Sequence, residues 1–278
     1  MTSVDRARAP LAEQRHALIL AEVSRNGAAR VSDFTTLLAV SEMTIRRDLD
    51  ALAKRGLLTK VHGGATVVAS GKSDEPGFEA KSSREQPEKQ LIAERAAALV
   101  QPNTAIGLTG GTTTWALAAQ LVDVPRLTVV TNSLRVAEVL HASTRSDQVV
   151  ILTGGVRTPS DALVGPVAEA TIRSLHVDLV FMGVHGIDAV AGLTTPNVGE
   201  AETNRAFAAS AGRLIAVADH TKWGCMGLSQ ILPLREVDTW VVDELPADAA
   251  PLLKEHAPRL TVVTARRPPR GSESRRMP

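Results

Sequence analysis

Apolar residues in the first quarter of the chain recur at the spacing of helices and then of short strands. Residues 11–25 carry them at helical spacing and predict one helix, and a short second helix is expected around Phe34. Ser41 is a good N-cap for a third helix. Residues 57–68 then predict two short strands around a glycine pair. The first part of the chain is therefore expected to form three helices followed by a hairpin.

From Leu91 onward, apolar helical stretches alternate with compact apolar runs. The runs are AIGL (105–108), LTVVT (127–131), VVILT (149–153), DLVFMG (178–183), LIAVA (214–218), TWVVD (239–243) and TVVTA (261–265). Strands that alternate with helices predict an α/β domain whose mainly parallel sheet is flanked by helices.

Composition sets the expected boundaries between these parts. The segment between the hairpin and the α/β domain is rich in Ser, Gly, Pro and charge, which is typical of a linker. Both ends of the chain are polar, and the last stretch is also basic, so both are expected to be disordered. The expected parts are a tail over 1–10, a helix-and-hairpin domain over 11–68, a linker over 69–88, the α/β domain over 89–265 and a basic tail over 266–278.

The overall balance of the chain excludes several classes of protein. Apolar residues make up 44% and charged residues 22% of the chain, with a net charge of +1, so any surface for nucleic acid must be local. The single Cys225 excludes an internal disulfide and a cysteine-rich zinc site. No apolar run is long enough for a membrane span, and the N-terminus lacks the apolar core of a signal peptide. A cytoplasmic protein is expected.

The stretch VSEMTIRRDLDALAKRGLLTKVHGGA, residues 40–65, contains a helix with one apolar and one polar face. Ile45, Leu49 and Leu52 recur at helical spacing and predict the buried face. Most of the polar residues of its first turns are expected to face outward: Thr44, Arg46, Arg47 and Asp48. Exposed Thr and Arg at a helix start suit the major groove of DNA, where arginine binds guanine edges or phosphates. The alternative is an ordinary amphipathic helix whose arginines face solvent.

The glycine pair after this helix predicts a tight turn, and Lys60 and His62 beside it form a short basic wing. In this order of parts, residues 14–68 resemble the winged helix-turn-helix of the DeoR family of bacterial transcription regulators. The matching positions are Ser41, the run Thr44 to Leu49, Leu52, Gly56 and the run Val61 to Ala65. The resemblance implies a set of residues that face DNA, Ser41, Thr44, Arg46 and Arg47, and a wing of His62, Gly63 and Gly64.

The run AIGLTGGTTTWALAAQL, residues 105–121, carries the strongest chemical signal of the second half. A short strand leads into a loop and then a helix; the loop is Gly110, Gly111, Thr112, Thr113 and Thr114. Glycines let backbone N–H groups turn toward one point, and the helix start and the hydroxyls add further donors, which is how proteins hold phosphate. The spacing fits neither a P-loop nor a dinucleotide-binding motif, so nucleotide hydrolysis is not supported. The alternative is a strand-to-helix turn with a threonine N-cap.

Other polar residues lie just past the ends of predicted strands, where parallel sheets place their ligands. Asn132 can bind sugar hydroxyls or make an Asx turn, and Lys222 can pair with phosphate or stay in solvent. Asp188 and Glu200 can accept hydrogen bonds from hydroxyls or act as turn and cap residues. No arrangement of residues has the spacing of a metal site or a catalytic triad, so no metal, cofactor or catalytic residue is expected.

The resemblance to the DeoR family continues to about residue 265. The matching segments are Lys89 to Ala97, GGTTT, TNS (131–133), LTGG (152–155), Val164 to Pro166, DLVFMG, Gly192 to Thr194, Glu200 to Glu202 and DHTKWG (219–224). The effector domain of that family is similar to ribose-5-phosphate isomerase, which implies a phosphorylated sugar or related metabolite as effector. The resemblance implies that Gly111 to Thr114 hold phosphate and that five further residues line the site: Asn132, Gly154, Gly155, Glu200 and Lys222.

Two positions depart from the pattern of many family members. Thr109 stands where many have Asp, and His220-Thr221 stand where many have a serine pair. The resemblance nevertheless implies a regulator, usually a repressor, that binds an operator in double-stranded DNA as a homodimer or homotetramer and responds to a phosphorylated sugar. The alternative function is a sugar-phosphate isomerase with an accessory domain, because the same pocket would serve that chemistry.

Overall fold

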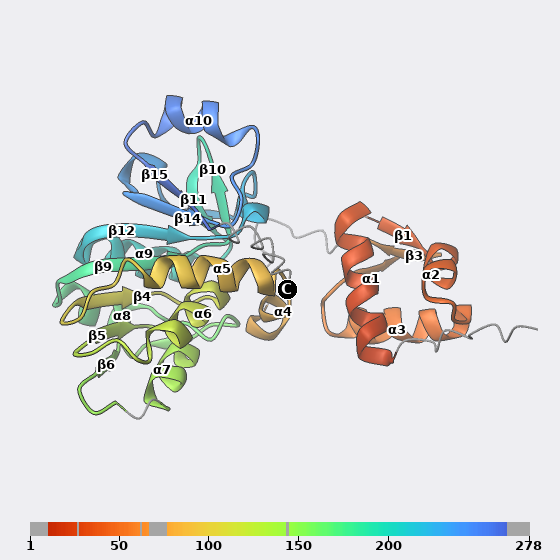
Figure 1. Cartoon of the computed structure of the whole chain (residues 1–278), viewed down its shortest axis with the longest axis horizontal. Helices are drawn as coiled ribbons and strands as arrows, with labels where there is room; N and C mark the ends of the chain where they lie inside the picture. Colours follow the sequence, from red (N-terminus) through yellow and green to blue (C-terminus); the bar gives the residue numbers. More distant parts are fainter. Residues whose placement is uncertain (1–10, 27, 62, 67–76, 143–144, 266–278) are drawn as a thin grey trace, which may run out of the picture. The chain divides into compact units, whose positions relative to one another are not determined.

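The computed structural model describes residues 11–26, 28–61, 63–66, 77–142 and 145–265 of the 278. The chain forms two compact units, residues 1–71 and 72–278 (Figure 1). Among the described residues, no helix has the length and apolar character that crossing a membrane requires.

The first unit contains three helices and a small antiparallel sheet. Its elements are α1 (Ala12–Asn26), β1 (Ala28–Arg30), α2 (Val31–Leu38), α3 (Glu42–Lys54), β2 (Thr59–Val61) and β3 (Gly64–Thr66). The strands lie in the order β1-β3-β2. The three predicted helices and the hairpin are confirmed, while β1 was not predicted. Gly64 is needed where β1 meets the hairpin, since a Cβ there would lie 2.3 Å from the carbonyl oxygen of Ala29.

The third helix of this unit forms as its sequence predicts. The Ser41 hydroxyl accepts a hydrogen bond from the Thr44 N–H at 3.3 Å and caps the helix. Ile45, Leu49 and Leu52 are fully buried, which confirms the predicted apolar face. Burial of each of these side chains contributes about 1.5–3 kcal/mol through the hydrophobic effect. The opposite face of α3 is thereby left to solvent.

The second unit is built on a seven-stranded parallel sheet in the order β15-β14-β12-β9-β4-β5-β6. The strands are β4 (Ala105–Leu108), β5 (Thr128–Thr131), β6 (Val149–Leu152), β9 (Val177–Gly183), β12 (Ala211–Val217), β14 (Thr239–Val242) and β15 (Thr261–Thr264). They coincide with the seven apolar runs, so the predicted α/β class with a mainly parallel sheet is confirmed. Because all seven strands run the same way, their carboxyl ends meet at one edge of the sheet.

Helices cover both faces of this sheet (Figure 1). They are α5 (Gln86–Ala97), α6 (Thr112–Leu121), α7 (Leu134–His141), α8 (Pro166–Arg173), α9 (Val198–Ser210) and α10 (Ala249–His256). The first three pack with the sheet in one apolar cluster, around Ile92 and Leu117, and the last three in another, around Phe207 and Trp240. Side chains alternate between the two clusters along β9: Leu179 and Phe181 belong to one, Val180 and Met182 to the other.

Smaller elements connect the strands of the main sheet and were not predicted. Two strands form a hairpin, β7 (Val156–Arg157) and β8 (Leu163–Val164), and three form a separate sheet, β10 (Gly186–Asp188), β11 (Gly192–Thr195) and β13 (Ser229–Leu232). Two short 3-10 helices are η1 (His220–Lys222) and η2 (Leu234–Glu236).

The structure differs from the predicted linker over residues 69–88 at its C-terminal end. Residues 78–82 form a helix, α4 (Phe78–Ser82), and α5 begins at Gln86. The polar composition concealed one buried aromatic residue, Phe78, whose contacts hold α4 on the second unit. Residues 69–76, like the predicted tails over 1–10 and 266–278, lie outside the described residues.

Candidate functional site

The solvent face of α3 carries the residues that the sequence assigns to DNA. Arg46 and Arg47 are exposed, and Thr44 is half-buried. The Arg46 guanidinium pairs with Glu42 at 3.0 Å, and both side chains are more than half exposed, so this pair costs little to break. The Thr44 and Ser41 hydroxyls lie 2.9 Å apart. The face therefore presents two arginines and two hydroxyls on one rigid element.

The predicted wing is the hairpin of β2 and β3. The Lys60 ammonium lies 2.6 Å from the Asp50 carboxylate, so an exposed ion pair joins the wing to α3. Gly63 has a φ of 81°, which favours glycine at this turn. His62, which the sequence also assigns to the wing, lies outside the described residues.

The most buried polar contact of the first unit had not been predicted. Asp48 was grouped with residues of which most were expected to face outward, but it is buried at 6% exposure. It accepts hydrogen bonds from Arg15 at 2.8 and 3.2 Å and lies 3.1 Å from His16. The helical spacing of α3 could not reveal this, because both partners belong to α1, more than thirty residues earlier in the chain.

In the second unit, the glycine-threonine loop joins the carboxyl end of β4 to α6. Gly111 precedes the helix and provides no side-chain cap, so the first N–H groups of α6 have no acceptor within the helix. Thr112 and Thr113 are 8% and 7% exposed, and among the described residues their hydroxyls make no hydrogen bond within the chain. Thr114 differs, since its hydroxyl donates to the carbonyl oxygen of Thr109 at 2.7 Å.

This loop is held by the neighbouring strand ends. The Gly110 N–H donates to the Asn132 side-chain oxygen at 2.9 Å, and the Asn132 amide donates to the Leu163 carbonyl at 3.0 Å. Asn132 is 1% exposed, so its role in this structure is to fix the loop from within. Thr109, where many family members have Asp, is fully buried and accepts a hydrogen bond from the Gly183 N–H at 3.0 Å.

The β7–β8 hairpin contacts three of the predicted effector residues, Gly110, Gly155 and Glu200. A Cβ on Gly110 would lie 2.6 Å from the Cβ of Ala162, and a Cβ on Gly155 would lie 2.6 Å from the carbonyl oxygen of Val164. The Thr158 hydroxyl donates to Glu200 at 2.8 Å. Nothing in the sequence identified this segment, because RTPSDAL has the composition of an ordinary loop. Gly154 follows the end of β6 and has a φ of 72°.

Glu200 lies in the first turn of α9 with both carboxylate oxygens engaged. Besides Thr158, the Thr195 hydroxyl donates to it at 3.3 Å. Its own backbone N–H donates to the side chain of Asn197, the N-cap of the helix. The carboxylate is half-buried and is held by two hydroxyls that a ligand hydroxyl could replace.

Lys222 lies in a charged group at the end of β12. It follows Asp219, which is fully buried and whose Oδ2 has no hydrogen-bond partner among the described residues. Lys89 from α5 is also buried, and its ammonium donates to the carbonyls of Lys81 and Arg84. Burial, opposed by the charge of Asp219 and assisted by that of Lys222, lowers the pKa of Lys89 to about 8.

His220, the residue after Asp219, forms a pair with Asp243 that the sequence did not predict. Its Nδ1 lies 2.7 Å from the Asp243 carboxylate. Burial opposes the charged form of His220, but the hydrogen bond and the charge of Asp243 outweigh it and raise the pKa of the imidazole. This position therefore holds a group that favours a positive charge.

Asp188 has a different setting from the other predicted effector residues. It ends β10, and its carboxylate accepts hydrogen bonds from the N–H groups of Val190 at 2.9 Å and Ala191 at 2.7 Å. These contacts close the turn to β11, which is the turn role that the sequence left open for this residue.

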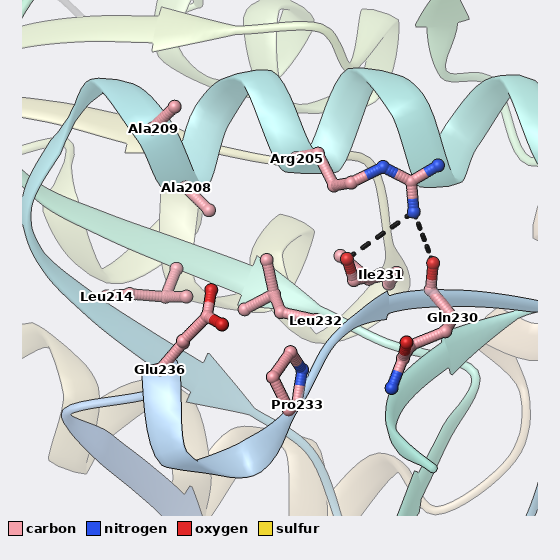
Figure 2. Close-up of a pocket in the computed structure, with 9 residues that line it drawn as sticks. All are labelled: Arg205, Ala208, Ala209, Leu214, Gln230, Ile231, Leu232, Pro233 and Glu236. Carbon is pink, nitrogen blue, oxygen red and sulfur yellow. Dashed lines mark hydrogen bonds between the residues drawn. The ribbon is translucent and has the colours of Figure 1, made fainter.

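A separate groove of about 480 Å³ lies between α9, β13 and η2 (Figure 2). Its floor is apolar, and Arg205 and Glu236 are its charged residues. The Arg205 guanidinium is engaged by the carbonyls of Gln230 and Ile231 and by Glu202. None of the predicted effector residues lines this groove.

Across the described segments, no three His, Cys, Asp or Glu residues are placed to hold a metal ion. The groups described above include hydroxyls, backbone N–H groups and ammonium groups, which are the kinds of ligand that bind an anion.

Comparison with known families matches both units. The model of the DeoR-like helix-turn-helix domain matches residues 15–71, and that of the DeoR C terminal sensor domain matches residues 84–244.

Curated relatives align over most of the chain. GolR of Listeria innocua, an HTH-type transcriptional regulator, is 36% identical over 83% of this chain and 90% of its own length. The HTH-type transcriptional repressor CsqR of Escherichia coli is 32% identical, over 84% and 89%. The lactose phosphotransferase system repressor of Staphylococcus aureus is 31% identical, over 80% and 88%.

Similarity to solved structures is weak. A ribose-5-phosphate isomerase in complex with phospho-erythronic acid gives a TM-score of 0.38 with 16% identity, over 53% of this chain and 58% of the isomerase. The delta subunit of eIF2B from Chaetomium thermophilum gives 0.39 with 14% identity, over 81% and 92%. At these scores the likeness carries no information about activity.

Proposed function

Since the chain belongs to the DeoR family of transcription regulators, we propose that it represses genes of carbohydrate metabolism under the control of a phosphorylated sugar. One relative is named a repressor of the lactose phosphotransferase system, which supports both the sign and the pathway class. The observation that carries the effector part is the start of α6, where N–H groups and the Thr112 and Thr113 hydroxyls lack partners among the described residues. A regulator of this kind works in the cytoplasm.

The α3 face and the wing are the proposed DNA-binding surface. Between Ser41 and Gly64 the local excess of positive charge is small, so one copy binds weakly and a homodimer or homotetramer that reads two half-sites is required. A dimer that neutralises about eight phosphates gives a slope of about −7 when log affinity is plotted against log salt. A binding titration on operator DNA at several salt concentrations measures this slope, and a flat response would exclude the proposed surface.

The effector proposal is tested by a thermal-shift screen of the full chain against phosphorylated sugars and inorganic phosphate. A ligand of the native state raises the Tm with its concentration. Thr113→Val removes the hydroxyl and keeps the shape of the side chain, so it should lose much of the shift, while Thr113→Ser should retain it. Equal shifts in both variants would show that the loop does not hold the phosphate.

Two further measurements separate control of DNA binding from catalysis. A regulator requires its operator affinity to change when the stabilising sugar is present, because a ligand shifts two states only through different affinities for them. We propose that the chain is not an enzyme, and a coupled isomerase assay on the purified full chain tests this. Turnover of a phosphosugar would favour the isomerase alternative.

A further inference from the structure

The α4 helix lies against the rim of the proposed effector site. The Phe78 ring meets the Trp115 ring of α6 edge-on, with centroids 5.8 Å apart. The guanidinium carbon of Arg135, in α7, lies 5.3 Å from the centroid of the Phe78 ring. A helix of five residues is not stable without tertiary contacts, so the position of α4 depends on its neighbours.

The loop between β7 and β8 provides the polar half of this docking surface. The Phe78 N–H donates to the carbonyl oxygen of Pro159 at 3.1 Å. The Lys81 ammonium donates to the Ser160 hydroxyl at 2.6 Å. Arg135 pairs with Asp161 at 2.7 Å and with Glu79 of α4 at 3.2 Å, so it joins the loop to the helix. Every residue of the segment Thr158–Asp161 except Pro159 is buried.

The same segment is connected to Glu200 by hydrogen bonds. The Thr158 hydroxyl donates to Glu200 at 2.8 Å and accepts from the Ser160 N–H at 3.3 Å. An unbroken path therefore runs from Glu200 through Thr158 and Ser160 to Lys81 of α4. Each step is a direct contact between buried or half-buried groups, where a hydrogen bond is electrostatically stronger than in water.

The segment also contains a residue with a strained backbone conformation. Asp161 has a φ of 58°, in the left-handed region that non-glycine residues occupy at a cost. Arg135 and Arg157 both pair with its carboxylate and hold it there. A loop that its neighbours hold in a strained conformation changes when one of those contacts is lost.

We propose that the segment Thr158–Asp161 couples ligand binding at Glu200 to the docking of α4, and through α4 to the chain that leads to the DNA-binding unit. This inference rests on the effector site proposed above. A hydroxyl group of a bound phosphosugar that donates to Glu200 displaces the Thr158 hydroxyl. The bond between Thr158 and the Ser160 N–H is then no longer oriented by Glu200, and α4 loses the support of Pro159 and Ser160.

The coupling is measured without any ligand, as residue-resolved hydrogen exchange of the Phe78 N–H in the full chain. Thr158→Val keeps the shape of the side chain and removes the hydroxyl, and should speed this exchange by about tenfold, the size expected for one lost hydrogen bond. Thr158→Ser keeps the hydroxyl and should exchange like the wild type. Thr171→Val removes an exposed hydroxyl of α8 that bonds only within its own helix, and is the matched control.

Wild-type exchange in Thr158→Val would overturn the proposal, as would equal acceleration in Thr171→Val. If Thr158→Val does not fold, Glu200→Met, which removes both acceptor oxygens and keeps the length of the side chain, tests the same path from its other end, with the same expected acceleration and the same overturning result. Because no ligand is present, a negative thermal-shift screen would remove the effector site and leave the exchange result standing. Unchanged exchange would remove the coupling and leave the effector site.

Discussion

Arg15 and Asp48 join the first and third helices of the DNA-binding unit through two hydrogen bonds, at 2.8 and 3.2 Å. Their side chains are 14% and 8% exposed, so the pair is largely shielded from solvent. Asp48 lies one position after Arg47 on α3. The pair therefore sets the position of α3 relative to α1, and with it the direction of the arginines that are proposed to contact DNA.

Asp48→Ala should lower the free energy of unfolding of the first unit by about 2–3 kcal/mol, because it removes a charged hydrogen-bond acceptor from the Arg15 guanidinium in a partly buried place. Hydrogen exchange of the α3 amides in the full chain measures this. Asp50→Ala is the matched control, since it breaks the exposed pair with Lys60 and should cost less than about 1 kcal/mol. Equal losses in the two variants would contradict the structural role of Asp48.

Arg47→Ala should weaken binding to an operator, selected by the purified chain from random-sequence duplexes, by about 1–3 kcal/mol if the side chain contacts a base. A contact to phosphate would instead weaken binding on all sequences alike and reduce the salt slope by about one. Arg235→Ala removes an arginine of the second unit that is 70% exposed, and should leave affinity unchanged. An unchanged Kd for Arg47→Ala would place DNA elsewhere.

The lowered pKa of Lys89 predicts that the free energy of unfolding rises at alkaline pH. Its pKa is about 8 in the folded chain against 10.5 ordinarily, so between these values the unfolded state binds more protons than the folded state. The contribution of this residue to stability is therefore absent below pH 8, rises through the window and is complete above pH 10.5, with a size of about 3 kcal/mol. The unfolding free energy of the wild type minus that of Lys89→Met should rise across this window, because methionine does not titrate. Lys254→Met, at an exposed position of α10, should give no such growth.

A comparison of alanine substitutions at Gly155 and Gly165 distinguishes the cost of backbone strain from that of a steric clash. Both have a left-handed φ, 120° and 93°, so alanine is strained at either position. At Gly165 a Cβ would meet nothing within 4 Å, and Gly165→Ala should cost about 1–2 kcal/mol. At Gly155 it would lie 2.6 Å from the Val164 carbonyl oxygen, so Gly155→Ala should cost clearly more and disturb the rim of the site. Urea unfolding compares the two, and similar midpoints would argue against the close approach.

Local patterns predicted the seven strands of the parallel sheet and the helices of the first unit. A strand that is buried on both faces consists of consecutive apolar residues, so apolar runs such as DLVFMG show where the strands lie in the sequence. Ser41 and three apolar residues at helical spacing likewise predicted α3. The glycine-threonine loop was found for the same reason, because a strand, a glycine pair and a helix start are adjacent in the chain.

Contacts between distant segments could not be predicted in this way. The partners of Asp48 lie on another helix, and the Thr158–Asp161 segment meets Glu200 only after folding. The helix α4 forms where Phe78 packs against Trp115. No periodic pattern reveals these contacts, because each joins two segments that are far apart in the sequence and meet only in the folded chain. Periodicity records which face of an element is buried, whereas the partner of a polar group is chosen by the packing of elements far apart in the chain.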